Sequence, residues 1–503
     1  MIEQHSSLSE KFLKKGFWLY LFSFVLAPIW YAIKILISNE LSVEEVWILY
    51  GVISLVTLLW AYNDLGITES LNHFIPKYVT KKRYDKVKSI LVYSLLVQMI
   101  TGVSIALFFF FWSDFIAEKY FKHSAASDIL EVFSLFFIWI NFFQIIATFF
   151  IAVQDTFLNK ISSVLRMSFL LIFIIWLFIL DITTLRSFSF AWIFWLSWWI
   201  IFAGYVFIKK YYLIYLQKEK IIWSKKLFTT IFKYSFASFL WIQAGTILGQ
   251  IDMQMIIYIL WAKEAGYYTN YLSIVSIPFM LIWPIYIVLF PIFSEMHSKK
   301  EYSKIRLVKE ILNKNLLVIA IAFNILLFVF SEIIAYILFW EKFIKSGVIL
   351  QYSILLLSFN FLLQVNFNIL AWIWKVVDRM KIILIAIVIN FFLNLIFINM
   401  IWVYGAALAT GIGWVIIWWL SELFLWKNFK VQLDILYLLK NIIFLGIIWG
   451  GLYIFIVPIF LWLWRIQSLL YLSLLGMLYF WMFTYFNKKD FYFFINEIKK
   501  LRK

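Results

Sequence analysis

Residues 382–398 read IILIAIVINFFLNLIFI, and residues 169–180 read FLLIFIIWLFIL. Both runs are almost entirely apolar and contain no charged residue. A helix that spans a membrane needs about 20 largely apolar residues, and it satisfies its own backbone polar groups in lipid. A membrane barrel would instead show segments of about ten residues with strict alternation. These stretches predict an all-α polytopic membrane protein.

The composition of the whole chain supports the same fold class. Of its 503 residues, 65% are hydrophobic and 14% are charged, and the mean hydropathy is +0.92. A soluble domain carries roughly 25% charged residues. So few polar groups cannot cover a water-soluble surface, so lipid must be the solvent for most of the chain.

Hydropathy along the chain predicts about fourteen membrane spans. The first apolar segment begins near Phe17 and is a full span, so we expect no cleavable signal peptide. The expected spans cover residues 17–38, 46–70, 89–112, 129–153, 162–180, 188–208, 231–260, 266–293, 315–339, 347–373, 382–400, 404–426, 438–457 and 467–486.

Lysine and arginine gather in alternate loops. The richest segments are residues 77–88, 209–226, 299–306 and 488–503. By contrast, the loop with Glu40, Glu44 and Glu45 has neither Lys nor Arg. The positive-inside rule makes the basic loops cytoplasmic, together with both termini. Topology therefore explains the formal net charge of +17, and we expect no nucleic-acid partner.

An internal repeat connects the two halves of the chain. Residues 81–87 read KKRYDKV and residues 299–305 read KKEYSKI, a separation of about 220 residues. Further pairs at nearly the same separation are Glu45-Val46-Trp47 with Glu264-Ala265-Gly266, Gln144 with Gln364, and Lys160 with Lys381. The first six expected spans would then repeat as the next six.

Six is an even number, so both repeats have the same orientation in the membrane. Parallel repeats are related by an axis along the membrane normal, with a substrate cavity between them. We therefore expect an N-terminal lobe at residues 1–213, a C-terminal lobe at 214–430, and two extra helices with a basic cytoplasmic tail at 431–503. The alternative is that two basic loops became similar by chance.

Polar side chains inside the spans are candidates for a substrate or ion site, because they are unfavourable in lipid. The candidates are Asp64, Asp252, Lys34, Gln144, Gln250, Gln364 and Asn366. They predict a wet central cavity for a polar or charged headgroup. The alternative for the amides is hydrogen bonding between helices. Lys34, Arg166, Glu332 and Glu422 lie near span ends, where snorkelling to the interface is the simpler interpretation.

Enzyme and metal chemistry find no support in the sequence. The chain has no cysteine, and its four histidines are scattered. It has no GxxxxGK[ST], HExxH or GxSxG pattern. We therefore expect a transporter that is not an enzyme and has no cofactor or metal. Its energy would come from an ion gradient, the membrane potential or the substrate gradient.

Six segments in order resemble the MOP exporter superfamily, in its polysaccharide transporter branch of O-antigen and lipid-linked oligosaccharide flippases. They are residues 41–47 LSVEEVW, 64–66 DLG, 249–252 GQID, 266–270 GYYTN, 289–295 LFPIFSE and 404–410 YGAALAT. The resemblance covers roughly residues 10–430. It implies two six-helix lobes and alternating access that turns an undecaprenyl-diphosphate-linked glycan across the bacterial cytoplasmic membrane. Partners would be the lipid-linked glycan, membrane lipids and glycan-assembly proteins.

Three other functions stay open. Fourteen spans also resemble the peptidoglycan lipid flippases, which carry several cavity arginines, whereas here only Lys34 and Arg166 are available. A multidrug or cation antiporter of the related branch would use Asp64 and Asp252 as proton or sodium sites. A polytopic glycosyltransferase or ligase would need a large outer loop, which the sequence lacks.

Tryptophan stands where this family usually has glycine. The positions are Trp47, Trp60, Trp261, Trp372, Trp374 and Trp402, in a chain with 27 Trp and 16 Gly. An indole cannot replace glycine at a tight helix crossing or at a turn with positive φ. One hypothesis is that UGA codons read as glycine in the source organism were translated as tryptophan. The alternative is a Trp-rich protein with aromatic belts.

Overall fold

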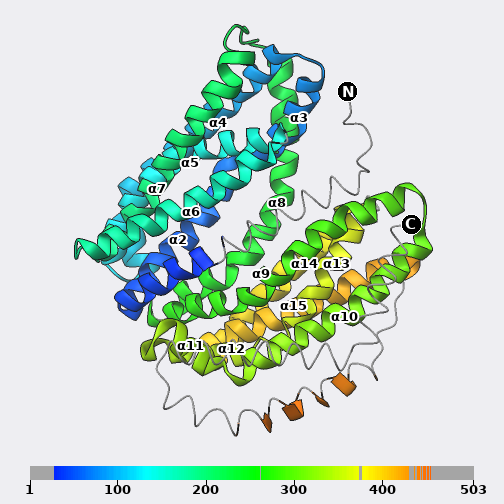
Figure 1. The fold of residues 1–503 in the computed structure, drawn as a ribbon. Coiled ribbons are helices and arrows are strands. Elements are labelled where there is room, and N and C mark those ends of the chain that lie inside the picture. Colours follow the sequence, from blue (N-terminus) through cyan, green and yellow to red (C-terminus); the bar gives the residue numbers. More distant parts are fainter. Residues whose placement is uncertain are drawn as a thin grey trace. The chain divides into compact units, whose positions relative to one another are not determined.

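The computed structural model describes residues 28–153, 155–260, 262–372 and 376–429, together with residue 26 and scattered residues between 436 and 454. Every regular element in this part of the chain is helical (Figure 1). A helix over residues 28–40 comes first. It is followed by α2 (Val43–Asp64), α3 (Ile67–Thr80), α4 (Tyr84–Ile116), η1 (Ala117–Phe121), α5 (Ala125–Ala152), α6 (Thr156–Ile179), α7 (Leu185–Phe207), η2 (Ile208–Leu216), α8 (Lys225–Ile259), α9 (Ala262–Ser298), α10 (Tyr302–Val329), α11 (Ser331–Phe339), η3 (Glu341–Phe343), α12 (Ile344–Gln351), α13 (Ser358–Trp372), α14 (Val376–Ile401) and α15 (Val403–Phe429).

Seven helices in the described part of the chain are long and apolar enough to cross a membrane. They lie at Val43–Asp64, Tyr84–Phe121, Ala125–Ala152, Leu185–Leu216, Tyr302–Val329, Asp378–Ile401 and Val403–Trp426. The prediction of an all-helical membrane protein is confirmed. The total of about fourteen spans stays a prediction, because the span expected at 467–486 lies outside the described residues and only scattered residues of the one at 438–457 are described.

Three expected spans are interrupted in the structure. The span expected at 46–70 breaks at Leu65 and Gly66, whose φ angles of 47° and 74° are left-handed. The span expected at 315–339 is divided at Phe330 between α10 and α11. The span expected at 347–373 contains a turn between α12 and α13. Hydropathy locates apolar segments but does not report the backbone conformation inside them.

Helix α2 shows how the sequence fixes a helix start. The Ser42 hydroxyl accepts a hydrogen bond from the Glu45 amide at 3.2 Å, and the Glu45 carboxylate accepts one from the Ser42 amide at 2.9 Å. This capping box satisfies two amide groups that a helix start otherwise leaves unpaired. Glu44 and Glu45 also place negative charge in the first turn, which the helix dipole favours.

The two loops of the predicted repeat have matching backbones. Lys82 in the first loop and Lys300 in the second have φ angles of 53° and 57°. In each loop the preceding helix ends two residues before this lysine, and the next helix starts two residues after it. Two loops that became alike in charge alone would not need the same turn, so this agreement supports the repeat.

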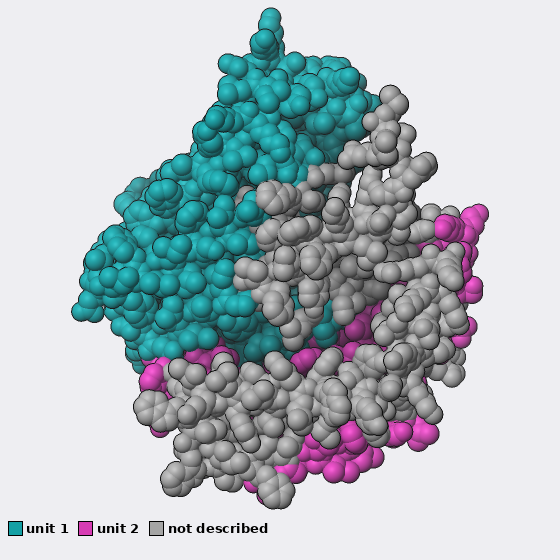
Figure 2. Space-filling view, in the orientation of Figure 1, with its two compact units in different colours: residues 1–288, 377–413 teal, residues 289–376, 414–503 magenta. Residues whose placement is uncertain are grey.

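The helices form two compact units, residues 1–288 with 377–413 and residues 289–376 with 414–503 (Figure 2). In the first unit, α4, α5 and α7 run side by side (Figure 1). Phe149, Phe150 and Trp199 belong to a buried apolar cluster there. The expected lobes at 1–213 and 214–430 were defined by a sequence repeat rather than by contacts, so they stay a prediction.

Two tryptophans occupy backbone conformations that suit glycine. Trp402 has a φ angle of 60°, and Trp340 has φ 69° and ψ 174°, a region that is essentially restricted to glycine. Trp47 packs directly against Gly266. The backbones of Trp340 and Trp402 support the recoding hypothesis, whereas Trp47 lies inside a helix with its indole fully buried. Trp261, Trp374 and the side chain of Trp372 lie outside the described residues.

Candidate functional site

The carboxylate of Asp252 joins four helices of the first unit. Asp252 lies on α8 and is 8% exposed. Its Oδ1 accepts a hydrogen bond from Asn394 Nδ2 of α14 at 2.6 Å. Its Oδ2 accepts one from the Tyr268 hydroxyl of α9 at 2.9 Å and another from the Thr410 hydroxyl of α15. We call Asp252 with Tyr268, Asn390, Asn394 and Thr410 the Asp252 cluster.

The partners of Asp252 also carry oxygens. Asn394 donates to the side-chain oxygen of Asn390, one turn earlier on α14, at 2.9 Å. The Asn394 oxygen itself is buried and has no hydrogen-bond partner among the described residues. One carboxylate, two amides and two hydroxyls form a set of hard oxygen ligands, which suits a small hard cation. The same carboxylate can also bind a proton.

Asp64 is held in a different way. It is the last residue of α2 and is 9% exposed. Its Oδ1 accepts hydrogen bonds from the Thr68 amide at 3.2 Å and the Thr68 hydroxyl at 2.7 Å. It also accepts one from Gln98 Nε2 of α4 at 2.8 Å. Asp64 therefore caps the start of α3 across the break at Leu65 and Gly66.

Amides extend the polar region around Asp64. Gln98 Nε2 lies 3.4 Å from Gln144 Oε1 of α5. Asn63 donates to Asn141 of α5 at 2.5 Å, and Asn141 donates to the Gln98 carbonyl at 2.7 Å. The Thr101 hydroxyl of α4 donates to Asn63 Oδ1 at 2.9 Å. We call Asp64 with Asn63, Thr68, Gln98, Thr101, Asn141 and Gln144 the Asp64 cluster. Two of the predicted residues, Asp64 and Gln144, thus meet through Gln98.

Gln250 contributes to helix packing between α8 and α2. The Ser54 hydroxyl donates to Gln250 Oε1 at 2.5 Å and accepts from Gln254 Nε2 at 2.8 Å. The Tyr120 hydroxyl of η1 in turn donates to Gln254. Gln250 therefore takes part in interhelical hydrogen bonding, the alternative considered for the amides.

The contacts of α2 with α8 and of the 28–40 helix with α9 come in repeat-related pairs. Tyr31 donates to the Ser273 carbonyl. At the separation that relates Trp47 to Gly266, Tyr31 corresponds to Gln250 and Ser273 corresponds to Ser54. These two counterparts also bond to each other. Ser38 donates to Asn270 at 3.2 Å. The residues that correspond to this pair are Ile257 and Gly51, which lie in contact. Trp47 and Gly266 correspond to each other and touch.

Paired contacts of this kind arise when equivalent surfaces face each other across a two-fold axis. The contact of Trp47 with its counterpart in the predicted repeat, Gly266, is of the kind that such an axis would produce. The helices that meet here are the first two of each predicted repeat.

Lys34 is buried rather than snorkelling. It lies on the 28–40 helix, is 2% exposed, and places its ammonium 3.1 Å from the centroid of the Tyr50 ring. Among the described residues it has no carboxylate partner. Snorkelling to the interface was therefore the wrong interpretation for Lys34.

Glu422 is likewise engaged inside its own unit. It accepts from Lys309 Nζ of α10 at 2.7 Å and from Asn366 Nδ2 of α13 at 3.1 Å. Lys309 is fully buried, so snorkelling was the wrong interpretation for Glu422 too. Asn366 also donates to Ser421 at 2.8 Å, whereas Gln364 donates to Asn360 of its own helix at 3.0 Å.

Lys309 was missed because the expected span began at residue 315, whereas α10 begins at Tyr302. One signal was available in the sequence. Ile305, Leu312 and Leu316 lie four residues before Lys309 and three and seven residues after it, which puts all four on one helical face. A lysine inside an apolar stripe indicates a buried, paired cation.

The remaining two charged candidates differ from each other. The Arg166 guanidinium lies 5.3 Å from the Phe143 ring centroid and 5.1 Å from that of Trp195. It is therefore held by aromatic faces rather than by the interface. Glu332 is exposed at the start of α11, as a residue at a span end should be.

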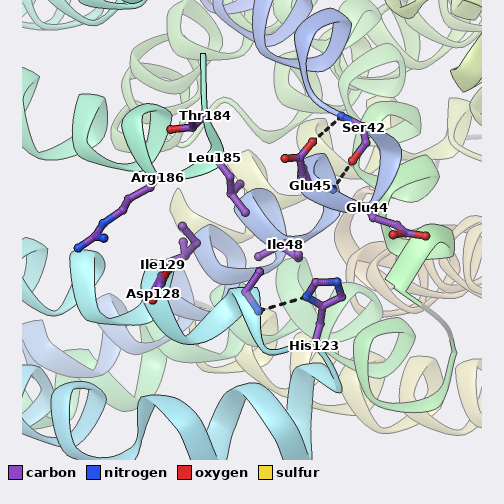
Figure 3. A pocket seen from close by; sticks show the side chains of 11 residues that line it. Ser42, Glu44, Glu45, Ile48, His123, Asp128, Ile129, Thr184, Leu185 and Arg186 are labelled. Carbon is purple, nitrogen blue, oxygen red and sulfur yellow. Dashed lines mark hydrogen bonds between the residues drawn. The ribbon is translucent and has the colours of Figure 1, made fainter. Parts of the chain in front are cut away.

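A pocket of about 380 Å³ opens between the starts of α2, α5 and α7 (Figure 3). It is lined by Ser42, Glu44, Glu45, Ile48, His123, Ala125, Asp128, Ile129, Thr184, Leu185 and Arg186. None of the predicted site residues lies in it. Across the described part of the chain, no group of three or more His, Cys, Asp or Glu side chains is placed to hold a metal.

Comparison with known proteins identifies the family. Residues 12–297 match the family described as "Polysaccharide biosynthesis protein". The chain belongs to this family. A protein that resembles the chain over most of its length is the uncharacterized membrane protein MJ1068 of Methanocaldococcus jannaschii. It is 27% identical over 440 residues, which are 85% of this chain and 86% of that protein.

Two solved structures have the same fold as this family member. The lipid II flippase MurJ in an inward closed conformation has a TM-score of 0.64 at 16% identity and covers 95% of this chain and 99% of its own. An inward-facing multidrug resistance MATE family transporter of the MOP superfamily has a TM-score of 0.64 at 15% identity. It covers 79% of this chain and 93% of its own. The chain thus has the fold of these two transport proteins, and its long apolar helices make it a multi-pass membrane protein.

Proposed function

We propose that the protein flips an undecaprenyl-diphosphate-linked oligosaccharide across the cytoplasmic membrane by alternating access. Membership of the polysaccharide biosynthesis family supports a glycan substrate. The extent of the structural matches supports a lipid carrier. The lipid II flippase covers 95% of this chain, whereas the multidrug transporter covers 79%. The same coverage fits a peptidoglycan lipid flippase equally well. The identity of the transported glycan therefore needs a direct test.

The observation that carries the proposal is the set of repeat-related contacts between the first helices of the two predicted repeats. The pairs Tyr31–Ser273 and Ser54–Gln250 are related by the repeat, as are Ser38–Asn270 and Gly51–Ile257. They support two parallel repeats about a shared axis. Parallel repeats of this kind place a substrate site between them and move against each other during transport.

The Asp252 cluster is the proposed coupling site of this transporter. It combines one carboxylate with hydroxyl and amide oxygens from α9, α14 and α15. A small cation or a proton bound there would change how four helices pack. Binding at this site therefore provides a physical link between an ion gradient and helix movement.

The test is a reconstituted flipping assay. Purified protein in vesicles is given a fluorescent lipid-linked oligosaccharide, and a membrane-impermeant quencher reports its leaflet. We expect transport that needs a sodium or proton gradient and falls at least tenfold in Asp252→Asn. The control is Asp128→Asn, which removes an exposed carboxylate of the pocket and should leave transport unchanged. Equal rates in all three proteins would exclude the coupling role of Asp252.

The same vesicles separate the proposed function from its rival. A cationic dye replaces the lipid-linked glycan as the transported molecule. Dye movement without glycan movement would show a multidrug or cation antiporter instead.

The orientation of the chain is part of the proposal. The absence of cysteine allows single cysteines to be labelled with an impermeant maleimide in whole cells. We expect Glu44→Cys to be labelled from outside and Lys81→Cys to be labelled only after lysis. The reverse pattern would invert the topology.

A further inference from the structure

The break between α2 and α3 has a buried carboxylate on one side and a closely packed glycine on the other. Gly66 has a φ angle of 74°, and a Cβ atom placed on it would lie 2.0 Å from the Ser235 carbonyl of α8. Ser70 and Ser235 share a hydrogen bond at 2.6 Å just beyond it. The start of α3 is therefore fixed to α8, while its link to α2 runs through the left-handed residues Leu65 and Gly66 and the Asp64 cap.

Gln98 has one unsatisfied atom beside this cap. It is fully buried, and its Nε2 points to two acceptors, Asp64 Oδ1 and Gln144 Oε1. Its Oε1 has no hydrogen-bond partner among the described residues. A buried acceptor without a donor is unfavourable, because it has lost its hydrogen bond to water. The two N–H groups of this amide thus have one acceptor each, whereas its oxygen lacks a donor.

We propose that the Asp64 cluster is a proton-binding site that controls the α2–α3 break. A proton from water binds the Asp64 carboxylate, and no other bond is made or broken. The new O–H group of Asp64 is a donor beside Gln98 Oε1, and a rotation of the carboxyl lets it donate there while Gln98 Nε2 keeps its own acceptors. The unsatisfied acceptor disappears, and the proton is released to water in the reverse step.

The effect on the backbone follows from the cap. A charged acceptor makes hydrogen bonds roughly twice as strong as a neutral one, and negative charge at a helix start is favourable. The protonated carboxyl therefore holds the Thr68 amide and hydroxyl less firmly. The start of α3 gains freedom relative to α2, while the Ser70–Ser235 contact keeps it on α8.

The other groups around Asp64 favour a proton over a metal cation. The neighbouring carboxylate is Glu69, one turn into α3, which interacts electrostatically with Asp64. Helices α4 and α5 present Gln98, Asn141 and Gln144, none of which titrates. On α2, Tyr62 packs against Phe239 of α8. On α8, Tyr234 stacks on His73, and Lys233 is exposed.

Three donors already converge on Asp64 Oδ1, which leaves too few free oxygens to replace the hydration shell of a sodium ion. A proton needs a single acceptor. The Asp252 cluster, with its additional hydroxyl and amide oxygens, differs in this respect.

Infrared difference spectroscopy of the full-length protein in vesicles tests the proton directly. We expect a protonated-carboxyl band that appears as pH falls, is lost in Asp64→Asn, and persists in Asp252→Asn. In Gln98→Met the band should shift, because its hydrogen-bond acceptor is gone. This variant keeps the test valid if Asp64→Asn fails to fold. A spectrum unaffected by both substitutions, or a band abolished by sodium at constant pH, would overturn the proposal.

A distance across the break tests its consequence. Spin labels at Tyr62→Cys on α2 and Lys77→Cys on α3 can be placed without background, because the chain has no cysteine. The distance distribution should broaden or shift at low pH and stay constant in Asp64→Asn. Identical distributions at both pH values would contradict the hinge. Neither measurement uses a substrate, so its failure is separate from a failure of the proposed flippase activity.

Discussion

Asp252 and Asp64 are both buried carboxylates inside apolar helices, yet their hydrogen-bond partners lie at different separations along the sequence. Asp252 accepts from the neighbouring helix α9 and from α14 and α15, which follow it by more than 140 residues. Asp64 accepts mainly from Thr68, four residues later, and from Gln98 on α4. The first is a tertiary junction, and the second is a local cap with one tertiary partner. A carboxylate in a span can therefore serve either purpose, and its partners decide which.

The largest expected effect comes from breaking the tertiary junction. Asp252→Leu removes the acceptor of Tyr268, Asn394 and Thr410, and each unsatisfied buried donor is unfavourable by about 1–3 kcal/mol. Asp64→Leu removes mainly a helix cap, a loss of about 0.5–2 kcal/mol. Thermal unfolding in detergent should show a clearly larger loss for Asp252→Leu. Equal losses would erase the distinction between junction and cap.

A third carboxylate, the partly buried Glu422 with its fully buried partner Lys309, extends the comparison to the second unit. Lys309→Met leaves Glu422 without its cation and should destabilise the protein by about 3–5 kcal/mol. The double variant Lys309→Met/Glu422→Leu should recover most of this loss, because it leaves no unpaired charge. A double-mutant cycle of unfolding free energies measures the coupling. A double variant as unstable as the single one would mean that packing, not charge, dominates here.

The local cap depends on the glycine beside it. Gly66→Ala introduces about 1–2 kcal/mol of left-handed backbone strain, and its Cβ would displace Ser235, which adds about 1–3 kcal/mol. The matched control is Gly245→Ala, since a Cβ there meets nothing within 4 Å. We expect the melting temperature to fall for Gly66→Ala alone. A similar fall for both would remove the argument for close packing at the break.

Tryptophan at a backbone suited to glycine gives the opposite expectation. Trp340→Gly should raise stability by about 1–3 kcal/mol, because φ 69° with ψ 174° is strained for any side chain. Trp176→Gly, an exposed position inside α6, should instead lower it by about 1 kcal/mol. The gene provides the second measurement. UGG codons at both Trp340 and Trp402 would contradict recoding at these positions.

The smallest effect is expected at a carboxylate in a loop. Asp155 accepts hydrogen bonds from Lys210 and Tyr211, each at 2.6 Å, and caps α6. Burial raises the pKa of Asp155, but these hydrogen bonds lower it by more, so the net pKa lies below its usual value. A depressed pKa stabilises the fold above the unfolded value of about 3.9. This contribution is lost as pH falls through the folded pKa.

Lys210→Met should therefore destabilise the protein by about 0.2–1 kcal/mol at neutral pH, the range for exposed ion pairs. The difference should vanish once Asp155 is protonated. The measurement compares unfolding midpoints at neutral pH and at a pH below the folded pKa of Asp155. The proteins compared are wild type, Lys210→Met and, as a control, the neighbouring Lys209→Met. An effect of Lys210→Met that is the same at both pH values would rule out the ion pair as its cause.

The candidate site was only partly predictable. Asp64 and Asp252 could be selected because a carboxylate inside a membrane span is unfavourable unless it has a partner or a function. Gln144 was selected as an amide, but its link to Asp64 runs through Gln98, on a helix that hydropathy alone does not place beside it. Lys309 escaped because a hydropathy window excluded the polar start of α10. The snorkelling interpretation of Lys34 was wrong because hydropathy does not show which face of a helix is covered.

The sequence by itself determined the fold class and the family. Apolar runs of about 20 residues force helices in lipid, and ordered motifs were enough to indicate the MOP superfamily. Tertiary structure decided what each polar residue does, because a hydrogen bond depends on which helices meet and at what angle. Asp64 and Asp252 look alike in the sequence. The left-handed break beside Asp64, and the three helices that converge on Asp252, make one a cap and the other a junction.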